Sequence, residues 1–263
     1  MRVRALVGKE FLDIIRNAGA LVPVAIVMVL ALALPFLIVI AIPAVTGDPL
    51  ARDADLVRLS AGTGTVYELS AEGQIQAFLF EQFLMLFLLT PITGAMALAA
   101  HSVVGEKQAR TLEPLLATPI TTVELLVAKV IGSLVPTLVI SLAGLAIYFG
   151  GVALFGAEGV AGALMTVRTA LLVLVVGPAA ALVSLQAAII VSSRVNDART
   201  AQQFGVLIIV PLSALMIAQF TGTVWLSNAM LGFIGAGLLV LWMLLTLVSA
   251  ALFDRESILT RWR

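Results

Sequence analysis

Long uncharged stretches alternate with short charged segments along the chain. The main gaps between charged residues cover residues 17–47, 82–105, 130–157, 169–193 and 200–253. An ionised side chain at the centre of a bilayer costs at least about 2.5 kcal/mol, so each gap is a candidate membrane-crossing region. The first four each hold one helix of about 20 residues, enough to cross about 30 Å of hydrocarbon. The fifth is too long for one helix and has a polar turn at residues 219–228, so it predicts two.

The pattern therefore predicts an all-α integral membrane protein with a single domain over residues 1–263. Its expected transmembrane helices are residues 20–42, 78–101, 124–149, 169–191, 204–218 and 227–252. The uncharged run after Arg16 is much longer than the apolar core of a cleaved signal peptide, so we interpret it as a retained helix.

The first 17 residues have a helical period of their own. Apolar side chains from Val3 to Ile15 fall on one arc, and Lys9 and Asp13 fall on the opposite arc. This favours an amphipathic helix at the membrane interface over residues 1–17. The alternative is an unstructured basic segment leading into the first span.

Residues 46–76 form the longest expected link on the face opposite the termini. The link is acidic, with irregularly spaced carboxylates at Asp48, Asp53, Asp55, Glu68 and Glu72. A Ca²⁺ or cationic-substrate site is one interpretation, but the spacing matches no EF-hand pattern and favours a solvated external loop.

Composition agrees with a membrane protein and excludes several other classes. Hydrophobic residues make up 61% of the chain and charged residues 11%, whereas soluble domains have about 25% charged residues. The net charge of zero gives no reason to expect nucleic-acid binding. Without cysteine and with one histidine, His101, the chain lacks the side chains for a Cys- or His-based metal centre.

The basic residues predict the orientation. With six spans, all of the 15 Lys and Arg residues except Arg52, Arg58 and Arg168 lie on the face of the termini. The positive-inside rule therefore places both termini in the cytoplasm. We expect the plasma membrane as the location.

The segment between the second and third spans is longer than a simple link needs. It reads GEKQARTLEPLLATPITTVELLVAK, residues 105–129. Glu106, Arg110 and Glu113 have spacings that place opposite charges on one helical face. Thr121 and Glu124 have the spacing of a capping box at the start of the third span. We predict a short, rigid cytoplasmic elbow made of a helix, a sharp turn and a new helix.

This segment resembles the signature of permease subunits of ABC transporters of the type 2 exporter family. The resemblance also covers the interfacial helix, the six spans and the basic C-terminal tail. It implies that the elbow sits in a cleft of a separate cytoplasmic ATPase, with a second permease copy completing a homodimer or heterodimer. The chain has no GxxxxGK[ST] phosphate loop, so the partner would bind ATP and Mg²⁺, and this chain would carry no cofactor and be no enzyme.

The resemblance also assigns roles to individual residues of the elbow. Pro119 and Glu124 would set its geometry, and Lys129 would anchor the start of the third span. The expected ATPase contacts are Glu106, Lys107, Arg110, Thr111, Leu112 and Glu113. The alternative interpretation is that the basic residues are only positive-inside determinants with surface carboxylates as partners.

A few other polar residues are candidates for function. Arg194, Asp197 and Arg199 lie in the second cytoplasmic loop and form either a second ATPase contact or a plain hairpin loop. Gln186 and Glu81 lie in or beside spans and are candidates for a substrate pathway. For Gln186 a helix-to-helix hydrogen bond is the alternative, and for Glu81 a position at the external interface.

The expected function is ATP-driven export by alternating access, with the direction of transport taken from the family resemblance alone. An ATPase-linked assembly factor of the same fold, for example in metalloenzyme maturation, is the main alternative. A secondary transporter driven by an ion gradient is a weaker one, because the chain shows no inverted repeat and no ionisable residue at mid-membrane.

Overall fold

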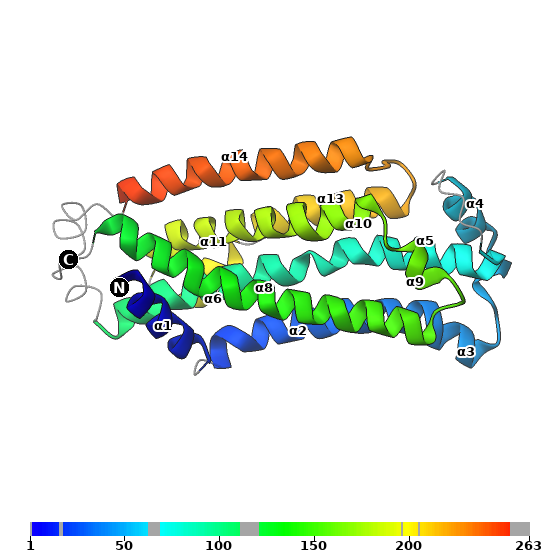
Figure 1. The fold of residues 1–263 in the computed structure, drawn as a ribbon, viewed down its shortest axis with the longest axis horizontal. Helices are drawn as coiled ribbons and strands as arrows, with labels where there is room; N and C mark the ends of the chain where they lie inside the picture. The colour runs from blue at the N-terminus through cyan, green and yellow to red at the C-terminus, as the bar shows by residue number, and fades with distance from the viewer. Residues whose placement is uncertain are drawn as a thin grey trace.

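The computed structural model describes residues 2–15, 18–62, 69–110, 121–195, 197–204 and 206–252. All regular structure in these residues is helical, and Figure 1 shows long helices lying side by side along one axis. The predicted all-α fold is therefore confirmed.

Sixteen helical elements follow one another within the described residues. They are α1 (Arg2–Ile15), α2 (Ala18–Phe36), the π-helix η1 (Leu37–Ala41), α3 (Ile42–Thr46), the 3₁₀ helix η2 (Leu50–Arg52), α4 (Ala54–Gly62), α5 (Ala71–Phe87), α6 (Leu89–Gln108), α8 (Thr122–Phe155), α9 (Val160–Ala163), α10 (Val167–Leu171), the π-helix η3 (Leu172–Val176), α11 (Gly177–Arg194), α12 (Ala198–Gln203), α13 (Val206–Phe220) and α14 (Asn228–Leu252).

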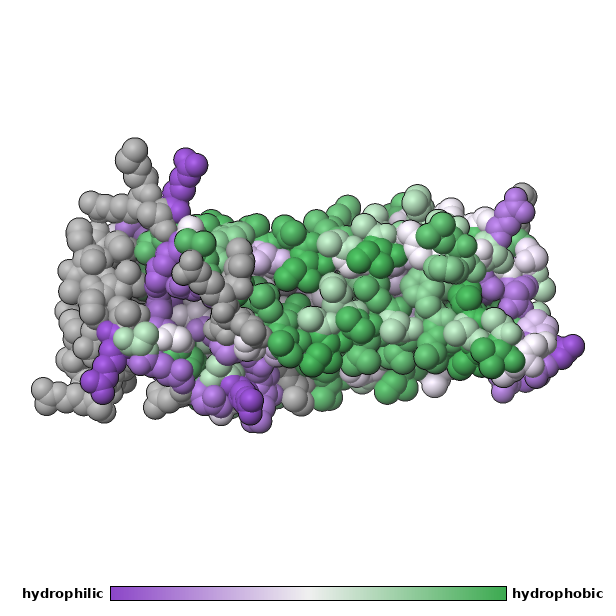
Figure 2. Space-filling view, turned by 90° about the horizontal axis from the view of Figure 1, so that it is seen from below, coloured by the Kyte–Doolittle hydropathy of each residue, from purple (hydrophilic) through white to green (hydrophobic). Residues whose placement is uncertain are grey.

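Six segments of the described chain are long and apolar enough to cross a membrane, as the sequence predicts. They cover Gly19–Thr46, Ala71–Gln108, Val123–Phe155, Val167–Arg194, Ala198–Phe220 and Asn228–Ala250. Figure 2 shows a broad apolar band in the middle of the molecule with polar residues toward both ends. This distribution is what a bilayer requires of a spanning bundle.

The two ends of the bundle differ. One end carries α1, the end of α6, the start of α8 and the end of α14, and we call it the α1 end (Figure 1). The opposite end carries α3, α4 and α9, and we call it the α4 end. Part of the expected external loop is helical, because η2 and α4 lie within it and α5 begins at Ala71 after an N-cap at Ser70.

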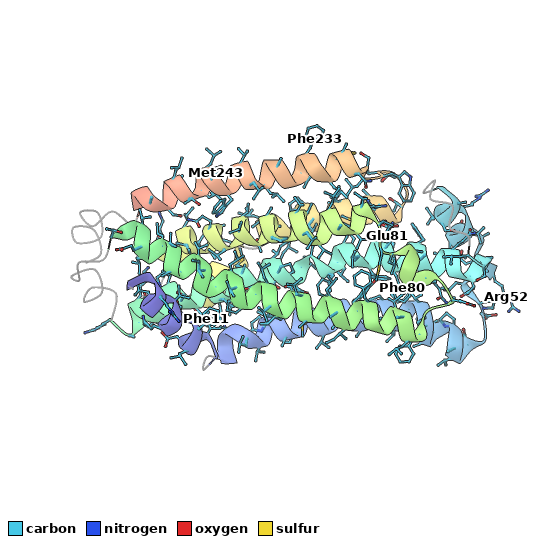
Figure 3. The ribbon with its side chains drawn as sticks, viewed as in Figure 1. Phe11, Arg52, Phe80, Glu81, Phe233 and Met243 are labelled. Carbon is cyan, nitrogen blue, oxygen red and sulfur yellow. The ribbon has the colours of Figure 1, made fainter. Side chains whose placement is uncertain are left out.

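The span formed by α5 and α6 is the centre of the bundle. It is the most buried of the six, with α10, η3 and α11 next, whereas most of α2, α8, α13 and α14 faces outward. Phe233 and Met243 of α14, for example, point away from the other helices (Figure 3). This is the arrangement expected for helices whose outer faces contact lipid.

Tyr148 joins α8 to this central span in the half of the bundle nearer the α4 end. Its side chain is fully buried, and its hydroxyl donates a hydrogen bond of 2.6 Å to the main-chain oxygen of Phe80. Phe36 of α2 packs on both rings, with ring centroids 5.4 Å from Phe80 and 5.8 Å from Tyr148. A polar atom in an apolar region needs such a partner, and this bond fixes the position of α8 against α5.

Candidate functional site

The α1 end contains a cluster of charged side chains that we call the ion cluster. Its members are Lys9 and Glu10 of α1, Ser102 and Glu106 of α6, and Lys129 of α8. Ser102 and Glu106 are four residues apart and therefore lie on the same face of α6. Three elements that are distant in sequence meet at this point.

Lys129 is at the centre of the ion cluster. Its side chain is 1% exposed, and its ammonium lies 2.8 Å from Glu106 Oε2 and 3.2 Å from Glu10 Oε1. It also donates to the hydroxyl of Ser102 at 2.9 Å. A buried ammonium is tolerated only when its protons are satisfied and its charge is compensated, and here two carboxylates and a hydroxyl do both.

Lys9 closes the ion cluster on the solvent side. Its ammonium lies 2.6 Å from Glu106 Oε1 and 3.9 Å from Asp13 Oδ2. Partial burial alone would lower the pKa of Lys9, but the hydrogen bond and the negative charge of Glu106 outweigh it and raise that pKa. The stabilisation from this shift is therefore complete at neutral pH and is lost only as the pH rises above the usual range of lysine.

Glu10 is held by two neighbouring helices. The hydroxyl of Ser102 donates to Glu10 Oε2 at 2.6 Å, so Ser102 contacts both Lys129 and Glu10. On the α8 side, a Cβ atom at Gly132 would lie only 2.6 Å from the Cβ of Glu10. Glycine at this position is therefore what lets α1 approach α8 closely enough for the ion cluster to form.

The elbow begins differently from the sequence prediction. α6 ends at Gln108, and Arg110 has a φ of +54°, which is left-handed backbone. Glu106 and Arg110 thus do not share one helical face, and that prediction was wrong because the helix ends before the second residue. Glu106 points inward to the ion cluster instead, whereas Arg110 is exposed.

The end of the elbow, where α8 begins, has the structure that the sequence predicts. The side chain of Thr121 accepts from the backbone N–H of Glu124, and the Glu124 carboxylate accepts from the backbone N–H of Thr121 at 2.9 Å. This is the predicted capping box, and it opens α8. Thr111, Leu112, Glu113 and Pro119 lie outside the described residues.

Lys107 connects the elbow to the next loop at the α1 end. Its ammonium donates to the main-chain oxygens of Ser193 and Val195, at 2.8 Å and 3.0 Å. These oxygens lie at the end of α11, where helical carbonyls lack donors, so Lys107 supplies the missing hydrogen bonds. Lys107, which directly follows Glu106 of the ion cluster, thereby attaches the elbow to the loop that contains Arg194.

Asp197 caps α12 in that loop. The backbone N–H of Thr200 donates to its carboxylate at 3.1 Å and lowers the pKa of Asp197. The cap therefore persists at neutral pH and is lost only as the pH falls through the lowered value. Arg194 and Arg199 are exposed on either side of it.

The two candidates in the spans are placed apart from the ion cluster. Glu81 is 3% exposed and lies 3.3 Å from the guanidinium of Arg168, so it is a buried ion-pair partner. Figure 3 shows it toward the α4 end. Gln186 is fully buried in α11, and its amide has no hydrogen-bond partner within the described residues. The expected helix-to-helix hydrogen bond is therefore not found.

Sequence reasoning missed Glu10 and Ser102, and treated Lys9 as part of a solvated face. One signal was available for Glu10, which lies three residues after Val7 and four before Ile14, at the edge of the apolar arc of α1. In the fold this position faces the buried ammonium of Lys129. Among the described residues, no group of three or more His, Asp or Glu side chains is placed to hold a metal ion.

The bundle and the ion cluster define a polytopic helical membrane protein with charged connections concentrated at one end. The chain matches the model of the ABC-2 family transporter proteins over residues 4–235, and it belongs to that family. It is thus the membrane component of an ABC transporter. It matches no curated protein and no solved structure.

Proposed function

We propose that the chain is the permease subunit of an ATP-driven exporter, that a separate ATPase binds its elbow, and that a second permease copy completes the transporter. Membership of the ABC-2 family supports a transport role, and the absence of a phosphate-loop motif from the sequence supports a partner that hydrolyses ATP. In this proposal both termini and the α1 end face the cytoplasm, in the plasma membrane.

The ion cluster is the observation that carries the proposed mechanism. It joins two residues of the elbow, Glu106 at the end of α6 and Lys129 near the start of α8, and it links both to α1 through Lys9 and Glu10. Movement imposed on the elbow would therefore move α1, α6 and α8 together. Packed elements that shift as a unit are the usual basis of alternating access.

The elbow residues divide into two groups in this proposal. The first group would form or shape the ATPase contact and consists of Lys107, Arg110, Thr111, Leu112, Glu113, Pro119 and Glu124. In the second loop, Arg194, Asp197 and Arg199 would form a second ATPase contact. Glu106 and Lys129 are buried, so we assign them to transmission of movement inside the permease.

Orientation is tested with single-cysteine variants, since the native chain has no cysteine. A membrane-impermeant maleimide added to intact cells should label Arg52→Cys at the α4 end, and should label Arg110→Cys only after the membrane is permeabilised. Labelling of Arg110→Cys in intact cells would place the elbow outside and end the proposal.

Coupling is tested with a fluorophore at Arg52→Cys in vesicles that hold the chain and its ATPase. ATP should change the emission at this distant position in the native background. In a Lys129→Met background the change should be lost while the ATPase stays bound. An unaltered response to ATP in that background would contradict transmission through the ion cluster.

A further inference from the structure

A cavity of about 230 Å³ lies near the middle of the bundle, apart from the elbow and the ion cluster. It is bordered by the junction of α5 and α6, by the middle of α8, and by the junction of η3 and α11. Among the described residues that line it, Ser141 of α8 is the one polar residue, and the others are leucine, valine, phenylalanine, proline and glycine. An apolar cavity of this kind stays dry and accepts an apolar molecule.

The helices are irregular on two sides of this cavity. α5 ends at Phe87 and α6 begins at Leu89, with Pro91 in its first turn. On the other side η3 is a π-helix, and Pro178 follows it at the start of α11. A proline has no N–H for the preceding helical turn, so the regular rows of side chains that fill the space between helices are interrupted at both junctions. π-helical turns are also frequent at functional sites.

Ser141 gives the cavity a hydrogen-bonding group. Its side chain is 7% exposed, and its hydroxyl has no hydrogen-bond partner in the described part of the chain. One turn earlier, the hydroxyl of Thr137 donates to the main-chain oxygen of Ser133 at 2.7 Å, which is the common way to satisfy a hydroxyl within a helix. Ser141 does not form the corresponding bond. An unpaired hydroxyl in an apolar region is costly, and a ligand hydroxyl in the cavity would remove that cost.

The cavity opens between α8 and η3. Leu142 of α8 and Leu174 of η3 line it, and they are 53% and 66% exposed, so they lie where it meets the outside of the bundle. Both leucines are in the interior of membrane spans. The opening therefore faces hydrocarbon, and a ligand enters from the bilayer and not from water.

From these observations we propose that the cavity binds a small lipophilic phenol whose hydroxyl forms a hydrogen bond with Ser141. A cavity of about 150 Å³ holds benzene, so this larger one has room for two fused rings, and Phe87 in its lining offers an aromatic contact. A phospholipid fits less well, because its polar groups stay roughly 15 Å from the middle of the bilayer and its acyl chain would leave Ser141 unpaired. This inference concerns binding and does not depend on the proposed transport function.

Two probes that differ by one hydroxyl test the role of Ser141. The full chain is placed in nanodiscs, and binding of 2-naphthol and of naphthalene is measured by equilibrium dialysis against protein-free nanodiscs of the same lipid. Ser141→Ala should weaken the binding of 2-naphthol about fivefold, the usual contribution of one hydrogen bond, and should not weaken the binding of naphthalene. Ser133→Ala is the matched control, because Ser133 is a buried serine of the same helix with an unpaired hydroxyl and lies outside the cavity.

Three results of this experiment would overturn the proposal. The first is that nanodiscs with the native chain bind no more 2-naphthol than protein-free nanodiscs do. The second is that Ser141→Ala changes the binding of the two probes equally, which would mean that the hydroxyl of the ligand is not recognised. The third is an equal loss of 2-naphthol binding in Ser133→Ala, which would mean that the effect is not specific to the cavity.

A second pair of variants tests the location and serves even if Ser141→Ala does not fold. Leu142→Trp places an indole at the opening and should weaken the binding of both probes about tenfold. Leu154→Trp is the control, since Leu154 is a leucine of the same helix that is 79% exposed and does not line the cavity. Both positions are exposed, and thermal unfolding checks that each variant is folded. Unaltered binding by Leu142→Trp, or an equal loss in both variants, would place the probes elsewhere and refute the site.

Discussion

At the scale of single residues, Lys129 has a role in the fold that its position in the sequence does not suggest. In the sequence it is a basic residue near the end of a span, where positive-inside charges are common. In the fold its ammonium is buried against Glu10, Ser102 and Glu106. Separations of 119 residues to Glu10 and 27 to Ser102 explain why no local pattern predicted these contacts.

Replacing Lys129 with Met should destabilise the protein strongly. The methionine has a similar length, but it leaves the carboxylates of Glu10 and Glu106 buried with less compensating charge. Removal of one partner from a buried ion pair costs about 3–5 kcal/mol. Chemical unfolding in detergent, followed by tryptophan fluorescence, would measure this loss.

A compensating variant tests the cause of that loss. Adding Glu106→Gln to Lys129→Met removes one of the uncompensated charges and should restore part of the stability. Asp13→Asn, at an exposed position, should cost less than about 0.5 kcal/mol. If Lys129→Met costs no more than Asp13→Asn, the ion cluster is not a stabilising feature.

At the scale of the elements, the start of α8 was predictable and the end of α6 was not. The capping box of Thr121 and Glu124 depends on residues three apart, so the sequence alone contains it. The predicted continuation of α6 to Arg110 depended on charge spacing, and nothing in that spacing specifies the left-handed residue that follows the helix. The position of α1 on α8 depends on Gly132, which no local pattern marks.

Alanine substitutions at two glycines of α8 should have effects of opposite sign. Gly132→Ala should destabilise the protein by about 1–3 kcal/mol, because the new methyl group overlaps Glu10 and pushes α1 away. Gly150→Ala meets nothing and should stabilise it by up to about 1 kcal/mol through helix propensity. Unfolding curves of the two variants give the comparison, and equal shifts would mean that α1 does not pack as described.

The capping box makes a separate prediction for the elbow. Thr121→Ala removes the acceptor for the backbone N–H of Glu124 and should cost about 0.5–2 kcal/mol. Hydrogen exchange should accelerate in the first turn of α8 and stay unaltered in its middle. Val123→Ala, at an exposed position two residues along, is the control, and a similar acceleration in both variants would argue against the cap.

At the scale of the whole molecule, the sequence predicted the fold class and the six spans because charge-free segments are a strong constraint in a bilayer. It also identified the family from the elbow motif, and the family model matches residues 4–235. The arrangement of the spans around α5 and α6 was not predictable, since contacts between apolar helices depend on shape and leave no charge pattern. The ion cluster depends on that arrangement and was missed with it.

The central claim is that the α1 end holds a separate ATPase through the elbow. The most direct measurement is capture of ATP-hydrolysing activity by a tagged chain solubilised from its native membrane. Two charge reversals are compared with the native chain: Arg110→Glu in the elbow, and Arg52→Glu, which is equally a surface change but lies at the α4 end.

The account predicts that the native chain and Arg52→Glu capture the ATPase and that Arg110→Glu loses most of it. All three proteins should reach the membrane in equal amounts, because both positions are exposed. Absence of ATP hydrolysis in the native capture, or equal capture by Arg110→Glu, would contradict the account.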